Sequence, residues 1–385
     1  MRVTCTSREL QEAVKIAENA VEPRTISPIY WYLLLRAEGS ALTITGTGYE
    51  KTIRVNMSAR IAQEGAITVP SKTFSDLIDN TPSDREVELV SEDDTKLTVR
   101  SSGTRSRFNS FPSADFPMYT CIGDDIAISL PFGILRHSLQ HVSASVASAK
   151  MGMPALMGIH ISLADGSLVL SSTDGFRASR VSVPCTVSHD QSGGDYRAII
   201  PVSTASAICK FPFDDDTDAI IYLNRKENAL EVVVGNDLDL GVRIKSQCIS
   251  GIFPTIDSVF LSEHTTSITL ASGDLKLAIN RAFAMARGVS NSISLHIKDD
   301  SLLMISSSDY GKSESILSGK VIGEGSIMIN GRYLADAIDS ADSDMITIHI
   351  GDRKQVILIT NGSDNTDDYK HIVLPMVGEL ETQDK

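Results

Sequence analysis

One pattern occurs three times along this chain, and the repeat constrains the fold more than any other feature. Each copy has a strand, a turn residue and the start of an amphipathic helix, at Ile67–Ile78, Ile199–Ile208 and Ile327–Ile338, about 130 residues apart. A strand that leads into a helix also opens each third, at Arg2–Val21, Ala127–Val146 and Thr266–Ala286. A period near 130 is far longer than the 20–50 residues of solenoid repeats. The sequence therefore predicts three like domains side by side.

The length of the chain agrees with several domains, because 385 residues exceed what one hydrophobic core usually organises. We expect the domains at 1–124, 125–252 and 253–385. Alternating apolar and polar residues, as in Glu86–Leu89 and Leu230–Val234, predict strands. Short polar turns between neighbouring strands predict antiparallel hairpins. The predicted fold class is α+β, with an antiparallel sheet and two helices in each domain.

The charge and the cysteines limit the classes of function. The net charge of −14 argues against a protein whose whole surface coats nucleic acid, although a local cationic patch stays possible. The five cysteines are scattered without a CxxC pair, which excludes a zinc knuckle or a dithiol redox motif. The longest apolar run, Ile29–Leu35, is too short to span a bilayer, and the N-terminus does not read as a signal peptide. We expect a cytoplasmic protein.

The usual enzymatic motifs for nucleotide, zinc or nucleophilic-serine chemistry do not occur in this sequence. Asp174 and Asp309 occupy equivalent turns in two repeats, but aspartate in such turns more often binds its own backbone. His137 and His141 share a helix face, as metal-binding pairs do, yet no third ligand accompanies them locally. A polar stripe is the favoured interpretation. We expect neither an enzyme nor a cofactor.

Short motifs along nearly the whole chain resemble those of the bacterial β sliding clamps, the processivity subunits of DNA polymerase III. They are Pro23–Leu35, Ser106–Phe108, Ala114–Pro117, Leu156–Ile159, Ser172–Ala178, Gly251–Pro254, Asn330–Tyr333 and Ile372–Met376. The chain departs from the family pattern at Phe176, usually His, at Ala178, usually Leu, and at Ser258, often basic. Val377–Lys385 extends beyond the usual C-terminal end.

The resemblance implies a head-to-tail homodimer that closes as a ring around duplex DNA, without reading its sequence. The implied partners are the polymerase III catalytic subunit, other polymerases, the clamp loader and a second copy. The implied dimer contacts are Phe108, Ala284, Met285, Arg105 and Arg107. Packing within one domain is the alternative for Phe108 and Met285.

Cations occur on every helix that would line such a ring, although the whole chain is acidic. They include Lys15, Lys72, Arg136, Lys210, Lys276 and Arg281. Lys and Arg contact phosphates without reading bases, so binding would be mobile and independent of sequence. The resemblance adds Arg24 and Lys150 as DNA contacts. Randomly placed surface cations are the alternative.

A second implied site is an apolar groove, between the second and third domains, that holds short peptides from polymerases and the clamp loader. Its implied residues are Leu156, Thr173, Gly175, Phe176, Arg177, Ala178, Pro254, Val259, Tyr333, Ile372, Leu374, Pro375 and Met376. Two other classes of function stay open from the residues alone. One is an enzyme that uses Asp174 and Asp309, and the other is a scaffold that binds only protein.

Overall fold

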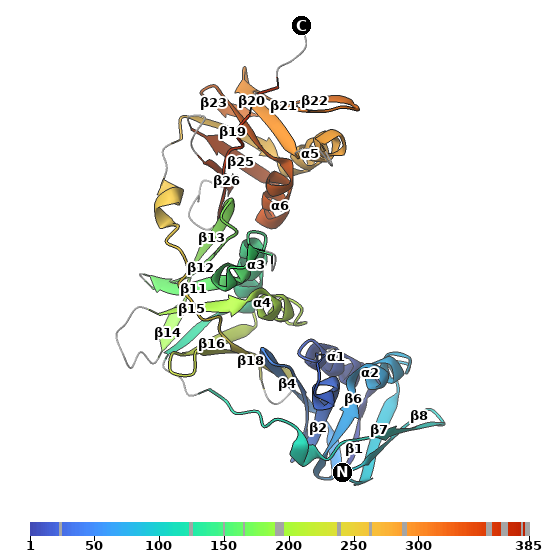
Figure 1. Cartoon of the computed structure of the whole chain (residues 1–385). Helices are drawn as coiled ribbons and strands as arrows, with labels where there is room; N and C mark the ends of the chain where they lie inside the picture. Colours follow the sequence, from blue (N-terminus) through green and yellow to red (C-terminus); the bar gives the residue numbers. More distant parts are fainter. Residues whose placement is uncertain are drawn as a thin grey trace. The chain divides into compact units, whose positions relative to one another are not determined.

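The computed structural model of the chain describes twelve stretches of residues: 1–22, 25–122, 126–148, 151–164, 166–188, 196–236, 240–261, 264–286, 291–351, 356–362, 369–378 and 380–381. The chain forms two compact units. The first takes in 1–136, 185–194 and 203–249, and the second takes in 137–184, 195–202 and 250–385. Figure 1 shows helices and sheets in both units.

The order of the elements repeats three times in the described part of the chain, with nine strands and two α-helices in each third (Figure 1). The first third holds β1 (Arg2–Thr6), α1 (Ser7–Glu18), β2 (Tyr32–Glu38), β3 (Ala41–Thr47), β4 (Lys51–Ser58), β5 (Arg60–Gln63), β6 (Gly65–Pro70), α2 (Ser71–Asp79), β7 (Glu86–Asp93), β8 (Lys96–Ser101) and β9 (Thr104–Asn109). The second third holds β10 (Ile126–Pro131), α3 (Phe132–Ser143), β11 (Gly158–Ala164), β12 (Ser167–Thr173), β13 (Arg177–Pro184), β14 (Thr186–Ser188), β15 (Arg197–Pro201), α4 (Val202–Ile208), β16 (Asp218–Asn224), β17 (Ala229–Gly235) and β18 (Leu240–Gln247).

The last third holds β19 (Thr266–Ala271), α5 (Ser272–Ala286), β20 (Ser292–Lys298), β21 (Ser301–Ser308), β22 (Gly311–Ser318), β23 (Lys320–Ile322), β24 (Gly325–Asn330), α6 (Gly331–Ala341), β25 (Met345–Ile350), β26 (Ile357–Asn361) and β27 (Tyr369–Val373). This order agrees with the sequence repeat. The bounds of the three expected domains stay a prediction.

Two antiparallel sheets build the first unit. Sheet A has the order β5-β1-β7-β8-β9, and sheet B has the order β14-β10-β16-β17-β18-β4-β3-β2-β6. Sheet B combines strands of two thirds of the chain, because β4 pairs with β18. In this joint Lys51 lies opposite Ser246, and Met57 lies opposite Leu240. The repeat pattern does not reveal that a sheet continues from one repeat into the next.

The second unit has the same construction. Sheet C has the order β15-β11-β12-β13-β27-β26-β25-β19-β23, and sheet D has the order β22-β21-β20-β24. The joint within sheet C pairs β13 with β27, with Arg177 opposite Val373 and Val181 opposite Tyr369. All described strand pairs are antiparallel, so the predicted α+β class is confirmed.

Helices α1 and α6 begin where a capping side chain precedes an amphipathic run. Thr6 caps α1 by accepting a hydrogen bond from the Glu9 N–H, while the Glu9 carboxylate accepts one from the Thr6 hydroxyl. Leu10 and Val14, one turn apart, are buried, so α1 turns an apolar face to the sheets. Asn330 caps α6 in the same way through the Arg332 N–H.

Two further properties bear on the sequence-based expectations. Within the residues that the structure describes, no helix has the length and apolar character needed to cross a membrane. All five cysteines are free thiols, in agreement with the missing CxxC pair.

Candidate functional site

A buried arginine at the start of β13 organises the region where many predicted site residues lie. The Arg177 side chain is 11% exposed, and its Nε lies 3.0 Å from a carboxylate oxygen of Asp174. Its Nη1 donates to Asp336 on α6 at 2.5 Å, and its guanidinium carbon lies 4.4 Å from the ring centre of Tyr333. Two carboxylates and an aromatic face therefore compensate one largely desolvated cation.

The turn before β13 is held by side-chain bonds to its own backbone. An Asp174 oxygen accepts from the N–H groups of Phe176 and Arg177, at 2.9 and 3.1 Å. The Thr173 hydroxyl accepts from the Gly175 N–H and donates to the Arg177 carbonyl. Gly175 has φ +88°, a conformation that favours glycine. The predicted turn role of Asp174 is confirmed, and the turn leaves the Phe176 side chain 54% exposed.

The chain after β27 lies beside this turn. The Leu374 N–H donates to the Phe176 carbonyl at 2.9 Å, and the Met376 N–H donates to the Met328 carbonyl on β24 at 2.8 Å. Leu374 is 40% exposed, and Pro375 and Met376 are half-buried. Phe176 and Leu374 therefore present neighbouring apolar side chains to solvent, as a docking site for a peptide requires.

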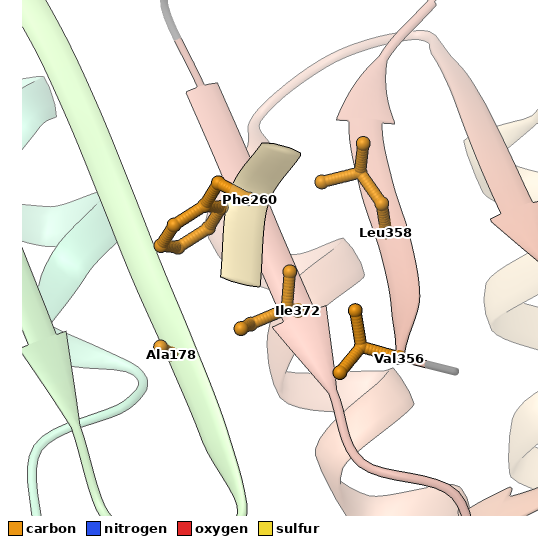
Figure 2. Packing of buried hydrophobic residues seen from close by; sticks show 5 residues of the cluster. All are labelled: Ala178, Phe260, Val356, Leu358 and Ile372. Atoms are coloured by element: carbon orange, nitrogen blue, oxygen red, sulfur yellow. The ribbon is translucent and has the colours of Figure 1, made fainter. Parts of the chain in front are cut away.

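A buried apolar cluster supports these residues from within the joint of sheet C. It consists of Ala178, Phe260, Val356, Leu358 and Ile372, with Ile256 and Val259 packed against it. Figure 2 shows the Phe260 ring directed toward β13, the strand that carries Ala178. Ala178 is only 1% exposed, so it belongs to the core under the site and offers no surface of its own.

The predicted peptide residues therefore do not all share one set of contacts. Interactions of the structure link Thr173, Gly175, Phe176, Arg177, Tyr333 and Leu374 at the Arg177 network and its turn, and Ala178, Val259 and Ile372 in the cluster. Leu156 is buried in the 3-10 helix Pro154–Met157, where its carbonyl accepts from Ala147. Pro254 is exposed. A peptide-binding role for all of them stays a prediction.

Asp336 is the member of this network that sequence reasoning missed. Tyr333 and Asp336 are three residues apart on α6, so both lie on one helix face. That spacing is a usable signal. It does not identify the partner, because Arg177 is far away in the sequence.

A cavity of about 620 Å³ adjoins the network, and Asp336 belongs to its lining. The rest of the lining comes from the end of α3 and from α6 and its C-cap: Gln140, His141, Ser143, Ala144, Asp339, Ser340 and Asp342. The His137 imidazole lies 3.7 Å from Asp342. Burial, and then the neighbouring His137, lower the pKa of His141 to about 4. No group of three metal-ligating side chains occurs among the described residues, so the histidine pair gains no support as a metal site.

Most of the predicted DNA-contacting cations are paired with acidic or polar neighbours. Lys15 lies 3.1 Å from Asp79, and Lys276 lies 3.0 Å from Asp339. Lys72 pairs with Asp76 at 2.8 Å, and Arg136 pairs with Asp215. Lys210 follows α4 instead of lying within it, and it donates to Asn19 at 3.3 Å.

Of the remaining predicted cations, only Arg281 lies among the described residues. Arg281 is exposed and has neither an ion pair nor a hydrogen bond from its side chain within the described part of the chain. Arg24 and Lys150 lie outside the described residues.

The predicted dimer residues lie on β9 and at the end of α5. The Phe108 ring is 8% exposed and packs edge-on against Phe74, with ring centres 5.8 Å apart. Packing within one domain therefore accounts for most of its surface. Arg105, Arg107 and Ala284 are exposed, and Met285 is half-buried. Their contact with a second copy stays a prediction.

Comparisons with known proteins point to one family. The family model described as the DNA polymerase III beta subunit, N-terminal domain, matches residues 1–120, and the C-terminal domain model of the same subunit matches residues 257–377. The beta sliding clamp of Synechocystis is 24% identical, over 94% of this chain and 95% of its own length. That of Chlamydia pneumoniae is 23% identical, over 98% and 99%.

Solved structures share the fold. A Pseudomonas aeruginosa sliding clamp bound to griselimycin superposes with a TM-score of 0.87 at 21% identity, covering 98% of this chain and 99% of that one. A putative DNA polymerase III beta subunit from Eubacterium rectale gives 0.85 at 20% identity, with the same coverage. The two family models together cover more than half of the chain, and the chain therefore belongs to the DNA polymerase III beta subunit family, the non-catalytic sliding clamps of DNA replication.

Proposed function

We propose that two copies of this chain close head to tail into a ring around duplex DNA and tether polymerases through the site around Arg177. The chain is a sliding clamp for DNA polymerase III. The closed homodimer, the peptide site and loading by a clamp loader are the proposed steps. The single observation that supports the ring is the way in which the sheets continue from one repeat to the next.

Each third of the chain contributes a five-stranded and a four-stranded half-sheet. The four-stranded half of the first third joins the five-stranded half of the second through β4 and β18. The second third joins the last in the same manner through β13 and β27. Two half-sheets are left, which are sheet A with β9 at one edge and sheet D with β22 at one edge. By position in the repeat, β9 corresponds to β18 and β27, and β22 corresponds to β4 and β13.

The same joint therefore fits between two molecules, with β9 of one copy beside β22 of the other. An open strand edge is a liability unless another strand covers it, and closed symmetry stops further growth. Charge adds little to this pairing, because β9 carries the exposed Arg105 and Arg107, whereas Glu314 on β22 already pairs with Lys312 of the same strand at 2.9 Å. Helix α5, which ends with the predicted contacts Ala284 and Met285, packs on β21 and β22.

Sedimentation equilibrium tests the dimer. At micromolar concentration the wild-type chain should show about twice its 41.6 kDa mass. Met285→Asp should raise the dimer dissociation constant at least about tenfold, because an unpaired carboxylate would be buried in the interface. Leu277→Asp is the matched control, since Leu277 is 57% exposed on the same helix. A wild-type monomer at tens of micromolar would exclude the ring.

Loading onto nicked circular DNA tests encirclement. Among the described residues, the predicted cations Lys15, Lys72, Arg136 and Lys276 are already in ion pairs, so we expect direct phosphate binding to be weak. Protein that a clamp loader has placed on a circle should survive gel filtration and leave only after the DNA is linearised. Equal retention on linear and circular DNA would indicate ordinary phosphate binding.

A further inference from the structure

Beyond Met376, one glutamate is bonded to two strands of sheet D. We name the described residues Val377, Gly378, Leu380 and Glu381 the tail strap. The Glu381 N–H donates to the Ser294 hydroxyl on β20 at 3.0 Å. A carboxylate oxygen of Glu381 accepts from the Ser307 hydroxyl on β21 at 2.5 Å. Because Met376 is bonded to β24, Met376 and Glu381 together contact three neighbouring strands of sheet D, which are β24, β20 and β21.

A histidine completes this anchor. The Glu381 carbonyl lies 2.6 Å from His296 Nε2, and the carbonyl can only accept, so Nε2 carries the proton. The other ring nitrogen of His296 lies 2.8 Å from the Ser326 hydroxyl. The backbone N–H, the carbonyl and the carboxylate of a single residue are thus all bonded to sheet D.

The strap covers the face of sheet D that points away from the helices. The Ser306 hydroxyl donates to the Ala282 carbonyl of α5, which places Ser306 on the helix side. Side chains alternate along a strand, so Ile305 and Ser307 lie on the opposite side. Ile305 is nevertheless fully buried, and its cross-strand neighbour Ser294 is 1% exposed. Glu381 is bonded to Ser294, so the strap shields this part of the outer face.

We infer that the tail strap positions the wall of the peptide site formed by Leu374, Pro375 and Met376. This inference rests on the proposed function of that site. The wall is bonded to the Phe176 carbonyl at one end and to the Met328 carbonyl at the other. Val377 and Gly378 are exposed, and Glu381 is the strap residue whose polar groups are bonded to sheet D.

An anchored wall binds better because less conformational freedom is lost when a peptide arrives. The match to the C-terminal domain model ends at residue 377, and the anchoring residue lies beyond it. The strap therefore adds a support that this chain carries outside the matched region.

Two truncations of the full chain separate the strap from the end of the chain. Deleting Gly378–Lys385 removes the anchor and keeps the wall, whereas deleting Thr382–Lys385 keeps both. The probe is a fluorescein-labelled synthetic pentapeptide with adjacent Leu and Phe residues. Its binding is measured by fluorescence anisotropy. The longer deletion should weaken binding about fivefold to tenfold, and the shorter one should bind like wild type.

Point variants test the anchor itself. Glu381→Ala should weaken binding about twofold to threefold. The double variant with Ser307→Ala should bind no more weakly than Glu381→Ala alone, because both substitutions remove the same hydrogen bond. Glu381→Gln should restore binding, since its amide oxygen still accepts from Ser307. Hydrogen exchange of the Met376 amide should become faster in the Ala variant while the melting temperature stays within about 1 °C, a split that a purely structural role would not produce.

The outcomes distinguish the two proposals. If wild type does not bind the probe, the proposed peptide site is wrong, and the strap inference is wrong with it. If wild type binds and the Gly378–Lys385 deletion binds equally well, the site is retained and the strap has no positioning role. Equal weakening by both truncations would also overturn the inference, because the effect would then come from residues after Glu381.

Discussion

Arg177 connects the turn before β13 with α6 through two ion pairs. It lies between Asp174, which also holds the turn that exposes Phe176, and Asp336 on α6. Removing one partner of a desolvated pair leaves the other charge less compensated, which costs more than the pair contributes. The network therefore links α6 to the turn before β13.

The first prediction concerns Asp336. Asp336→Ala should lower the free energy of unfolding by about 1–2 kcal/mol, because the Asp336 side chain is 36% exposed and solvent screens part of the loss. It should also weaken peptide binding, because Arg177 would no longer be fixed from both sides. Asp339→Ala is the control, since Asp339 is 68% exposed and pairs with the partly exposed Lys276. Urea denaturation and peptide titration measure both effects, and equal losses in the two variants would contradict the prediction.

The sequence predicted the part of the site that is local. Asp174 and Gly175 form a turn through bonds and backbone angles within the turn itself, so their role could be predicted from neighbouring residues. Lys72 and Asp76 are i, i+4 neighbours on one helix, so their ion pair could also be predicted from the sequence. Asp336 beside Arg177 could not be predicted, because pairing of elements far apart in the sequence brings these side chains together. The Ala178 position in the core could not be predicted for the same reason.

At the scale of elements, a connecting segment is held by a buried glutamate. Glu231 on β17 is 2% exposed. It accepts from the Tyr119 hydroxyl at 2.5 Å and from the Ile122 N–H at 3.1 Å. Burial, followed by this bond to Glu231, raises the pKa of Tyr119. Residues 119–122, which follow β9, are therefore attached to β17 of sheet B.

The second prediction tests that attachment. Glu231→Ala should lower the free energy of unfolding by about 2–3 kcal/mol, since it leaves the Tyr119 hydroxyl and a buried N–H without their acceptor. Chymotrypsin should then cleave after Tyr119 several times faster than in wild type, whereas the Phe116–Pro117 bond is not a chymotrypsin site. Glu227→Ala is the control, because Glu227 is half-exposed and forms only a surface ion pair with Lys245. Unchanged cleavage in the Glu231 variant would show that other contacts hold the segment.

Element positions followed from the sequence far better than the pairing of strands. The strand and helix of each repeat were predicted because apolar periodicity is a local property, as in Ile67–Ile78 for β6 and α2. The joints of β4 with β18 and of β13 with β27 were not predicted. Both partners of a joint have the same alternating pattern as any other strand, so the pattern does not identify the neighbour.

At the scale of the whole molecule, the histidines are unevenly distributed. All of them except His189 belong to the second unit. Burial, with a contribution from Arg177, lowers the pKa of His371 to about 3. Burial lowers the pKa of His349 to about 4, with His264 adding to the effect. Together with His141, these side chains stay neutral in the folded unit at pH values where they would take up protons after unfolding.

The third prediction is that the second unit loses stability first as the pH falls. Between about pH 6.5 and pH 4 the unfolded state binds more protons than the folded state, so stability decreases with decreasing pH. The slope is about 1.4 kcal/mol per pH unit for each such histidine. Amide hydrogen exchange at pH 7 and pH 5, corrected for intrinsic rates, should show loss of protection in β25 and β27. Strands β3 and β4 of the first unit are the internal control, and equal losses in both units would contradict the prediction.

The joints between repeats also mean that the two strands of each joint are synthesised at widely separated times. Lys51 on β4 pairs with Ser246, and Arg177 on β13 pairs with Val373. The partner of each strand is therefore synthesised almost 200 residues after the strand itself. At the usual 5–20 residues per second, a ribosome takes about 10–40 s to deliver that partner. During this interval the nascent chain exposes a β-strand edge of the kind that pairs with other chains. Each molecule has two such joints, so slow translation would lengthen the exposure of an unpaired strand edge at both of them. We therefore expect chaperones that bind extended segments to bind the nascent clamp.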